Sequence, residues 1–367
     1  MLALRHSIRR LPESVVTTLP LLAAILGLGA YTASKSDVFL SQANLQNLFE
    51  QISVLGLVTV GMTLLMVAGL LDLSVGALAS FIAVIAARLA ADGMSVAAII
   101  PIGIGVGLGV GLLTGAVVGT VRVPPFILTI GSWSVFVSLG LVLTEGQPIG
   151  VDSEAFTTIG IGRRFGIPIA GMLFVGALVL GALLLRYTRL GRNAYAVGSN
   201  PQAAFLSGVP MARVTVGLFA LNGLLVGIAG IVLLGRLGAG DATAGVGLEL
   251  QAVAAVVLGG ASLSGGRGTI WGSFLGVVLL GEISNSLNVL GTQLFYQQLV
   301  YGSVLIIAVV ATALREEQRL QAGRAVVASW RSRIGRQRIA ADPSGEAVTI
   351  VSPLAPSDEE SRVGEKE

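Results

Sequence analysis

The sequence contains no cysteine and a single histidine, His6. Without thiols there can be no disulfides or thiolate chemistry, and one histidine makes no cluster of metal ligands. Lysine is almost as scarce: Lys35 and Lys366 are the two present, and neither follows a GxxxxGK pattern. That pattern forms the phosphate-binding P-loop. We therefore expect no cofactor and no metal in this chain, and any ATP that drives it must be bound by another polypeptide.

Charged side chains are also few, at 12% of 367 residues, whereas 54% are hydrophobic and the mean hydropathy is +0.86. A soluble domain carries about 25% charged residues. A helix needs about 20 apolar residues to cross about 30 Å of hydrocarbon. We expect an all-α polytopic membrane protein with about ten transmembrane helices. The uncharged stretches are 14–34, 51–71, 73–87, 93–121, 123–144, 165–185, 214–235, 250–266, 268–281 and 283–314.

The charges between these stretches predict the orientation. With both ends in the cytosol, nine basic residues up to Arg267 lie on the cytosolic side and five on the other, together with acids that include Glu50 and Glu249. Such a bias is what the positive-inside rule requires. The basic residues are scattered between apolar spans, so the pI of 9.6 reflects topology and not a nucleic-acid surface. The first span follows Arg9 and Arg10, and we expect it to be retained and not cleaved as a signal peptide.

The composition changes after residue 314, which we place at the end of the transmembrane domain, 1–314. Residues 315–340 hold seven arginines and two acids, whereas residues 341–367 hold seven acids and two basic residues. The first segment is typical of a juxtamembrane helix on anionic membrane lipid, and the second of a disordered acidic tail.

Two short stretches do not look like solvated loops. Residues 69–76 read GLLDLSVG and residues 259–266 read GGASLSGG. Both are apolar and rich in small residues, which indicates broken helices whose free backbone groups are buried in protein. Their shared Leu-Ser core hints at an internal repeat. Separately, glycines at 103, 107, 111, 115 and 119 form a smooth ridge. Such a ridge lets another helix approach closely, with a pore-lining role as the alternative.

The longest predicted cytosolic loop, 186–213, encodes a short helix over residues 201–207. Asn200 is a good N-cap, Pro201 suits the first helical position, and Gly208 suits the position after the last turn. A helix of about two turns is marginal alone. Phe205 and Leu206 would then be exposed unless a partner covers them or the helix packs on the protein's own loops.

These segments belong to a wider pattern. It comprises GLLDLSVGA (69–77), VPPFILTIG (123–131), EGQPI (145–149), GRNAYAVGSNPQAAFLSGV (191–209), ELQAVAAVVLGGASLSGGRGTIWGSFLG (249–276), NSLNVLG (285–291) and YQQ (296–298). In this combination, from about residue 50 to 314, the chain resembles the membrane permease subunits of bacterial ABC importers of the ribose, xylose and arabinose type.

The resemblance implies a plasma-membrane (inner-membrane) permease that works as one of two membrane subunits, a homodimer or heterodimer. A cytosolic ABC ATPase would bind the ATP, and an extracytoplasmic sugar-binding protein would deliver a small sugar. The short loop helix would correspond to the family's coupling helix, which docks in a groove of the ATPase. Its residues here are Asn200, Ala203, Ala204, Phe205, Leu206 and Ser207.

Polar residues inside the spans mark candidates for the substrate pathway, because such groups need partners or water in a membrane. In the ninth span these are Glu282, Asn285 and Asn288, at spacings of three to four. In the first helix break, residues 69–76, they are Asp72 and Ser74; the second helix break is residues 259–266. Asn285 and Asn288 match the family pattern, whereas Glu282 stands where the family usually has an apolar residue. Each could instead hydrogen-bond a neighbouring helix, and Asp72 could tie down the broken helix.

Two other kinds of transporter remain open, one with a different mechanism and one with a different substrate. An ion-coupled secondary transporter could use Asp72 and Glu282 as coupling carboxylates, but it would not need a docking helix in its cytosolic loop. Within the ABC class, a branched-chain amino-acid permease has a similar architecture. A membrane enzyme is less favoured, since no paired acidic motif for metal and phosphate is present.

Overall fold

The computed structural model describes residues 13–293, 296, 299–304, 306–307 and 310. By its contacts the chain divides into residues 1–312 and 313–367, and the second unit lies outside the described residues. The segments predicted for 315–340 and 341–367, and parts of the last apolar stretch, therefore lie there too.

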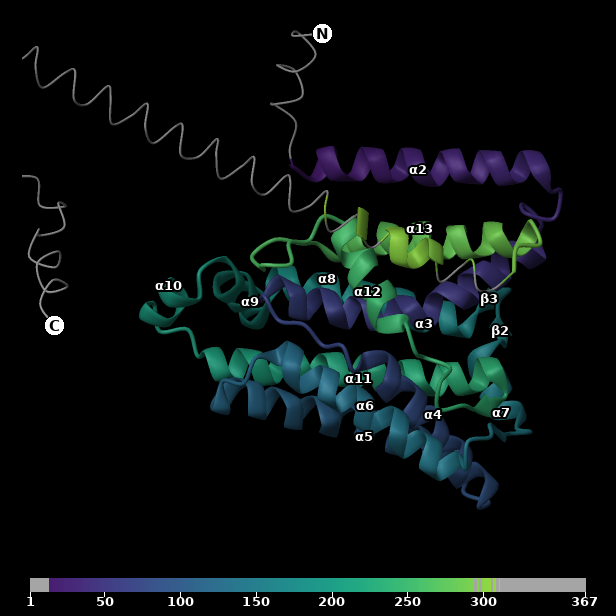
Figure 1. The fold of residues 1–367 in the computed structure, drawn as a ribbon, viewed down its shortest axis with the longest axis horizontal. Helices are drawn as coiled ribbons and strands as arrows, with labels where there is room; N and C mark the ends of the chain where they lie inside the picture. Colours follow the sequence, from purple (N-terminus) through teal and green to yellow (C-terminus); the bar gives the residue numbers. More distant parts are fainter. Residues whose placement is uncertain (1–12, 294–295, 297–298, 305, 308–309, 311–367) are drawn as a thin grey trace, which may run out of the picture. The chain divides into compact units, whose positions relative to one another are not determined.

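Figure 1 shows an arrangement made almost entirely of helices. The described elements are α2 (Glu13–Lys35), α3 (Gln42–Val67), α4 (Val75–Ala91), α5 (Val96–Ala116), η1 (Val117–Val121), α6 (Pro125–Thr144), β1 (Ile149–Gly150), α7 (Glu154–Gly160), β2 (Arg163–Arg164), β3 (Ile167–Pro168), α8 (Ile169–Tyr187), α9 (Arg189–Ser199), α10 (Pro201–Leu206), α11 (Met211–Leu237), β4 (Ala239–Gly240), α12 (Leu248–Leu258) and α13 (Ile270–Val289).

The expected all-α membrane fold is confirmed. Within the described residues six helices are long and apolar enough to cross a bilayer: α3, α5 with η1, α6, α8, α11 and α13. The apolar helices α4 and α12 are shorter, as broken helices should be. The boundary between the uncharged stretches 268–281 and 283–314 is not a helix boundary, because α13 continues through Glu282 without a break. A single buried carboxylate interrupts the hydropathy but not the helix.

Helices α3 and α11 form the centre of the bundle, and α5, α6 and α8 lie outside them. In the apolar windows of α3 and α11, 83% and 67% of the residues are buried, against 22%, 11% and 33% for α5, α6 and α8. The outer helices expose apolar side chains such as Leu113 and Val142. Such a surface is suited to lipid or to another membrane subunit.

The glycine ridge of α5 packs directly on α11, which confirms the predicted close approach. Gly107 lies against Gly223 and Gly227, and Gly111 against Gly223. A side chain at Gly107 would overlap the α11 backbone, whereas the positions between the ridge glycines, such as Gly109, face open space. Glycine on both sides of the contact therefore sets the distance between the two helices.

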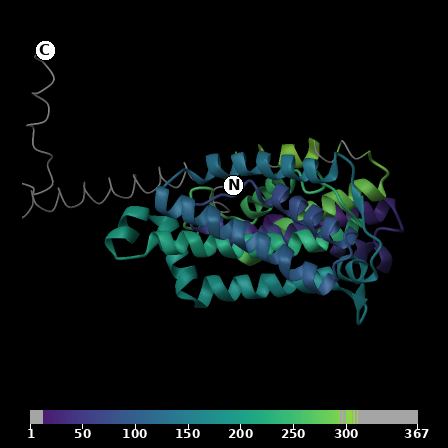
Figure 2. The ribbon, with the colours of Figure 1, turned by 90° about the horizontal axis from the view of Figure 1, so that it is seen from below.

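The bundle has two distinct ends, which Figures 1 and 2 show from directions at right angles. At one end, β1 pairs with β4 and the β2–β3 hairpin lies beside α7. At the other end are α9 and α10. Because α3 runs from the hairpin end to the α9 end, it can connect the two.

The segment between α11 and α12 folds back into the bundle instead of staying at its surface. Gly240 packs on Ala83 and Ala87, and the backbone N–H of Gly245 donates to Ser80 Oγ at 2.6 Å. Consequently α12 begins beside the first turn of α4. The side chain of Glu249 is buried in the bundle, because the chain re-enters before α12 starts.

Candidate functional site

The short helix predicted in the loop between α8 and α11 is present as α10. Asn200 has an extended backbone, and its Oδ1 accepts a hydrogen bond from the N–H of Ala203 at 2.9 Å. Pro201 occupies the first helical position, and Gly208 has a φ of +78° after the C-cap Ser207. The sequence thus encodes both ends of the helix through side-chain capping and glycine geometry.

The two faces of α10 differ sharply. Ala204 is buried and anchors the helix to the protein, whereas Phe205 and Leu206 are 63% and 78% exposed. Two large apolar side chains side by side on a capped but very short helix form a compact apolar surface. A partner with an apolar groove would bury them.

The helix before it, α9, was not predicted from the sequence. Thr188 caps it by accepting a hydrogen bond from the N–H of Gly191 at 3.1 Å. The Tyr195 hydroxyl donates to the carbonyl oxygen of Gly268 at 2.7 Å, and burial raises the pKa of Tyr195, so the hydroxyl keeps its proton as a donor. The mixed polarity of α9, with Arg189 and Arg192 exposed, hid it among the loop residues.

Both helix breaks meet at α9. The backbone N–H of Gly266, in the second break, donates to the carbonyl of Val67 at the end of α3, at 2.8 Å. Gly265 packs on Gly69, at the start of the first break, and Gly198 of α9 packs on Val67 and Gly266. These backbones touch without intervening side chains, so α9 is in direct contact with the end of α3, just before the first break, and with the second break.

The first break is fixed from within by Asp72. Its Oδ1 accepts from the backbone N–H and the hydroxyl of Ser74, at 2.9 and 2.6 Å, and its Oδ2 accepts from the Asn222 amide on α11 at 2.8 Å. All three side chains are at most 4% exposed. Asp72 therefore ties the break to α11 and also supports the start of α4.

Further polar groups surround the first turn of α4. Thr129 on α6 accepts from the backbone N–H of Leu73 at 3.1 Å, and Glu249 of α12 packs on Gly76. Asn222, Thr129 and Glu249 were not recognised as site residues from the sequence. Asn222 is the one polar amide in an otherwise apolar 214–235 stretch, which was a usable signal, whereas the position of Glu249 depends on the re-entrant loop.

The other predicted pathway residues form a second group, on α13. Asn285 and Asn44 of α3 exchange two hydrogen bonds of 2.9 Å through their amides. Glu282 is 6% exposed, lies against Gly29 of α2, and leaves its Oε2 without a partner. Asn288, further along the helix, is exposed.

The five predicted pathway residues are thus divided between two places. Asp72 and Ser74 lie at the start of α4, beside α11. Glu282 and Asn285 lie where α13 packs on α2 and α3. This division could not be predicted from the sequence, because the breaks and the polar spans are far apart in the chain.

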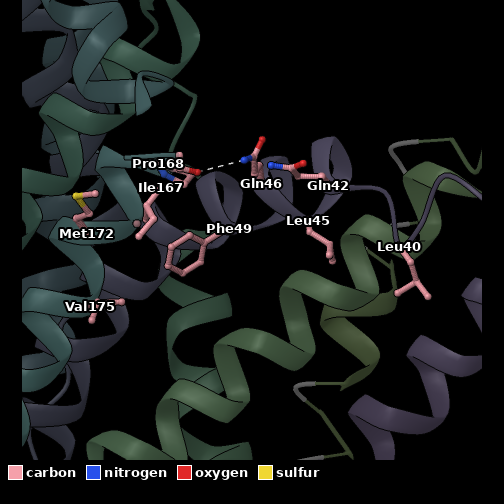
Figure 3. A pocket seen from close by; sticks show the side chains of 11 residues that line it. Leu40, Gln42, Leu45, Gln46, Phe49, Ile167, Pro168, Met172 and Val175 are labelled. Atoms are coloured by element: carbon pink, nitrogen blue, oxygen red, sulfur yellow. Dashed lines mark hydrogen bonds between the residues drawn. The ribbon is translucent and has the colours of Figure 1, made fainter. Parts of the chain in front are cut away.

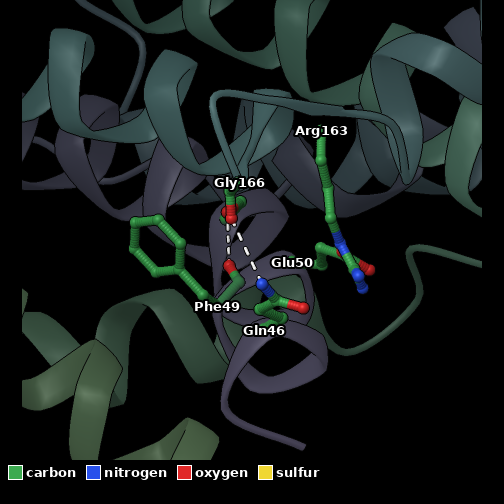
Figure 4. Close-up of polar contacts among 6 residues, drawn as sticks. Gln46, Phe49, Glu50, Arg163 and Gly166 are labelled. Carbon is green, nitrogen blue, oxygen red and sulfur yellow. Dashed lines mark hydrogen bonds and ion pairs between the residues drawn. The ribbon is translucent and has the colours of Figure 1, made fainter. Parts of the chain in front are cut away.

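At the hairpin end, a groove of about 870 Å³ runs between the start of α3 and α8 (Figure 3). Its lining is mainly apolar and includes Leu45, Phe49, Ile167 and Met172. The hairpin beside it is held to α3: Gln46 donates to the carbonyl of Gly166 at 3.2 Å, and Arg163 pairs with Glu50 at 3.3 Å (Figure 4). Among the described residues, no group of three or more potential metal ligands is present.

The family model and the relatives found by comparison with known proteins are all described as transport permeases. A family model described as the permease component of branched-chain amino acid transport systems matches residues 44–309. A ribose import permease of Bacillus subtilis strain 168 is 43% identical over 273 residues, covering 74% of this chain and 85% of that protein. A probable ABC transporter permease of Escherichia coli K12 is 36% identical over 319 residues, covering 87% and 96%. An L-arabinose ABC transporter permease of Azospirillum brasilense is 36% identical over 283 residues, covering 77% and 83%. No solved structure gives a significant match.

Proposed function

We propose that this chain, which belongs to the family of permease components described for branched-chain amino acid transport systems, is the membrane subunit of an ATP-driven importer for a small sugar. The sugar assignment is supported by relatives named for ribose and L-arabinose, which are 43% and 36% identical to this chain. Branched-chain amino acids remain the second candidate substrate, because the family model is named for them.

The proposal rests on a series of contacts that connects α10, through α9, with the two helix breaks. An apolar pair, Phe205 and Leu206, is exposed on α10, and α9 behind it touches both breaks. In the proposed mechanism a cytosolic ATPase binds α10 and moves it as it binds and hydrolyses ATP. The motion passes through α9 to the breaks, which change the conformation of the bundle. A secondary carrier would have no use for such a surface.

We extend the proposal to the orientation and the partners. If α10 is cytosolic, the hairpin end faces the extracytoplasmic side and receives a separate sugar-binding protein. Both termini would then lie in the cytosol, and the chain would lie in the bacterial inner membrane. A second permease subunit, identical or homologous, would cover part of the apolar surface of the outer helices.

For the substrate pathway we propose Asp72, Ser74, Glu282, Asn285 and Asn288. Glu282 has the strongest individual support, because its buried Oε2 lacks a partner in the structure. Asp72 and Ser74 are supported by their place where a short helix begins inside the bundle, which is where discontinuous helices of transporters bind their substrates. In the structure their own hydrogen bonds are satisfied by protein groups, so substrate would have to compete for them.

The test is reconstitution. The chain, its cognate ATPase and its binding protein are placed in proteoliposomes, and uptake of D-ribose, L-arabinose and L-leucine is measured. The proposal predicts sugar uptake that requires ATP and the ATPase. Uptake that persists without the ATPase, driven by an ion gradient, would favour the secondary carrier, and uptake of leucine alone would favour the amino-acid permease.

A further inference from the structure

The groove beside the β2–β3 hairpin, which we call the hairpin groove, lies between the first two turns of α3 and of α8. Both helices are long and apolar enough to cross a bilayer, and both begin at this end of the bundle. The groove therefore lies at the depth where the apolar interior of a membrane meets its polar surface. Its volume of about 870 Å³ is within the range of about 300–1,000 Å³ that is common for small-molecule sites.

The lining of the hairpin groove is divided into a polar edge and an apolar floor. Gln42 and Gln46 lie along the upper edge in Figure 3, whereas Phe49 and Val175 lie below them. The apolar surface continues past the groove on α8, where the exposed residues are Val179, Leu180 and Leu183. A molecule with one polar end and a long apolar chain matches this division.

A basic side chain lies at the mouth of the groove. Arg164 pairs with Ile167 across the hairpin, and residues directly opposite each other in an antiparallel pair project from the same face. Because Ile167 lines the groove, Arg164 lies on the groove side of the hairpin. Arg164 is exposed and belongs to neither of the ion pairs found in the described part of the chain. Its guanidinium lies over the ring of Phe165, 5.7 Å from the centroid.

The neighbouring charges leave the charge of Arg164 uncompensated. Arg163 forms an ion pair with Glu50 of α3 at 3.3 Å (Figure 4). That pair is formally neutral, so Arg164 gives this part of the surface a net positive charge. Basic residues near the surface of a membrane attract anionic lipids. The charge at the mouth of the groove is thus complementary to a phosphate group.

We propose that the hairpin groove binds one anionic phospholipid from the leaflet at this end of the bundle. The phosphate contacts Arg164 and the side-chain amide of Gln42, because guanidinium and amide N–H groups are donors and phosphate oxygens accept. The upper part of an acyl chain lies over Phe49 and Val175 and continues along α8. The inference goes beyond the proposed function, because such binding needs neither the ATPase nor the sugar.

The experiment uses the full chain, purified in mild detergent and given equal amounts of phosphatidylglycerol and phosphatidylcholine with the same acyl chains. Native mass spectrometry counts the lipids that each protein retains, and light scattering after size exclusion gives the number of copies. Arg164→Gln removes the charge, and Arg164→Lys keeps it. Val175→Trp fills the groove. Val179→Trp is the matched control, because Val179 lies one turn further along α8, outside the groove, and is 42% exposed against 44% for Val175.

We expect the wild-type chain to retain one phosphatidylglycerol in preference to phosphatidylcholine. Arg164→Gln should lower that preference roughly fivefold, the effect of one basic residue near an anionic headgroup. Arg164→Lys should keep most of the preference, because the phosphate still meets a positive charge. Val175→Trp should retain less of either lipid, while Val179→Trp should match the wild type.

Equal retention of the two lipids by the wild-type chain would overturn the proposal, as would unchanged retention in both Arg164→Gln and Val175→Trp. A change in the number of copies of Val175→Trp, without a change in lipid, would assign the groove to a second subunit instead. If Val175→Trp fails to fold, the comparison of Arg164→Gln with Arg164→Lys decides alone, because that side chain is exposed. The proposed function can fail independently, since its test is sugar uptake.

Discussion

The Asn222 side-chain amide on α11 donates a hydrogen bond of 2.8 Å to Oδ2 of Asp72 in the break between α3 and α4. The other oxygen of Asp72 is occupied by Ser74, so this carboxylate joins three segments of the bundle. A fully engaged carboxylate in this position holds the break in shape. A secondary carrier would instead require this carboxylate to take up and release protons.

Replacing Asp72 separates these roles. Asp72→Ala should cost about 2 kcal/mol of stability, because the Asn222 and Ser74 donors lose their acceptor in a buried site. Asp72→Asn should be much milder. After a flip of the Asn222 amide, its Oδ1, which has no partner in the structure, can accept from the new amide. The measurement is thermal unfolding in detergent, with Asp92→Ala as control, since Asp92 makes only an exposed ion pair with Arg88.

A coupling role for Asp72 would give the opposite pattern. Asp72→Asn would then fold normally and lose uptake together with any dependence of uptake on the proton gradient. That result would contradict the anchoring role.

The α5–α11 contact predicts a position-specific effect of adding one methyl group. Gly107→Ala would place its Cβ against the backbone of Gly223 and Gly227, so we expect a loss of about 1–3 kcal/mol, typical of overpacking. Gly109→Ala, on the open side of the same helix, should be neutral or slightly stabilising. Thermal unfolding of the two purified variants makes the comparison, and equal stability would show that the ridge does not set the helix spacing.

Glu282→Gln tests the second polar group. The variant keeps the size of the side chain and its ability to hydrogen-bond, so folded yield should stay normal. Uptake should fall, because the open carboxylate oxygen is the feature that we assign to substrate. Expression is followed by detergent extraction and transport by sugar uptake in the reconstituted importer. If neither changes, Glu282 does not belong to the pathway.

A substitution at Tyr195 distinguishes binding of the ATPase to α10 from transmission of its motion to the second helix break. Tyr195→Phe removes the hydroxyl that binds Gly268 in the second break, yet leaves the exposed face of α10 intact. We expect normal ATPase binding with fewer sugar molecules imported per ATP hydrolysed. The ratio of uptake to phosphate release measures this directly. An unchanged ratio would show that the 2.7 Å hydrogen bond does not take part in coupling.

Much of the fold could be predicted from local patterns. Apolar length identified the six long apolar helices of the described residues, and Asn200, Pro201 and Gly208 defined α10 because capping depends only on neighbouring residues. The spacing of Gly107 and Gly111 likewise predicted a close helix contact, because residues four apart share a helix face.

What the sequence could not supply was the arrangement of distant segments. Gly69, Gly198 and Gly265 are far apart in the chain, and their contact depends on the packing of whole helices. Glu249 lies inside the bundle because the segment after β4 re-enters it, and no local pattern distinguishes such a segment from an external loop. For the same reason the sequence could not show that Asp72 and Glu282 lie in different places in the bundle.

If an ATPase drives this protein through the exposed face of α10, Phe205→Asp should disrupt the contact between them. Placing a charge in the partner's apolar groove should cost about 2 kcal/mol, which weakens ATPase binding by roughly 30-fold. Phe205 is 63% exposed, so the bundle should still fold. Phe165→Asp, at an aromatic 89% exposed on the hairpin end, is the matched control.

The measurement is the amount of ATPase that co-purifies with each variant, together with folded yield in detergent and ATP-dependent uptake. We expect Phe205→Asp to keep a normal folded yield but to lose ATPase binding and uptake, while Phe165→Asp retains ATPase binding. Undiminished ATPase binding and normal uptake in Phe205→Asp would contradict it, and a collapse in folded yield would show that Phe205 serves the protein's own core.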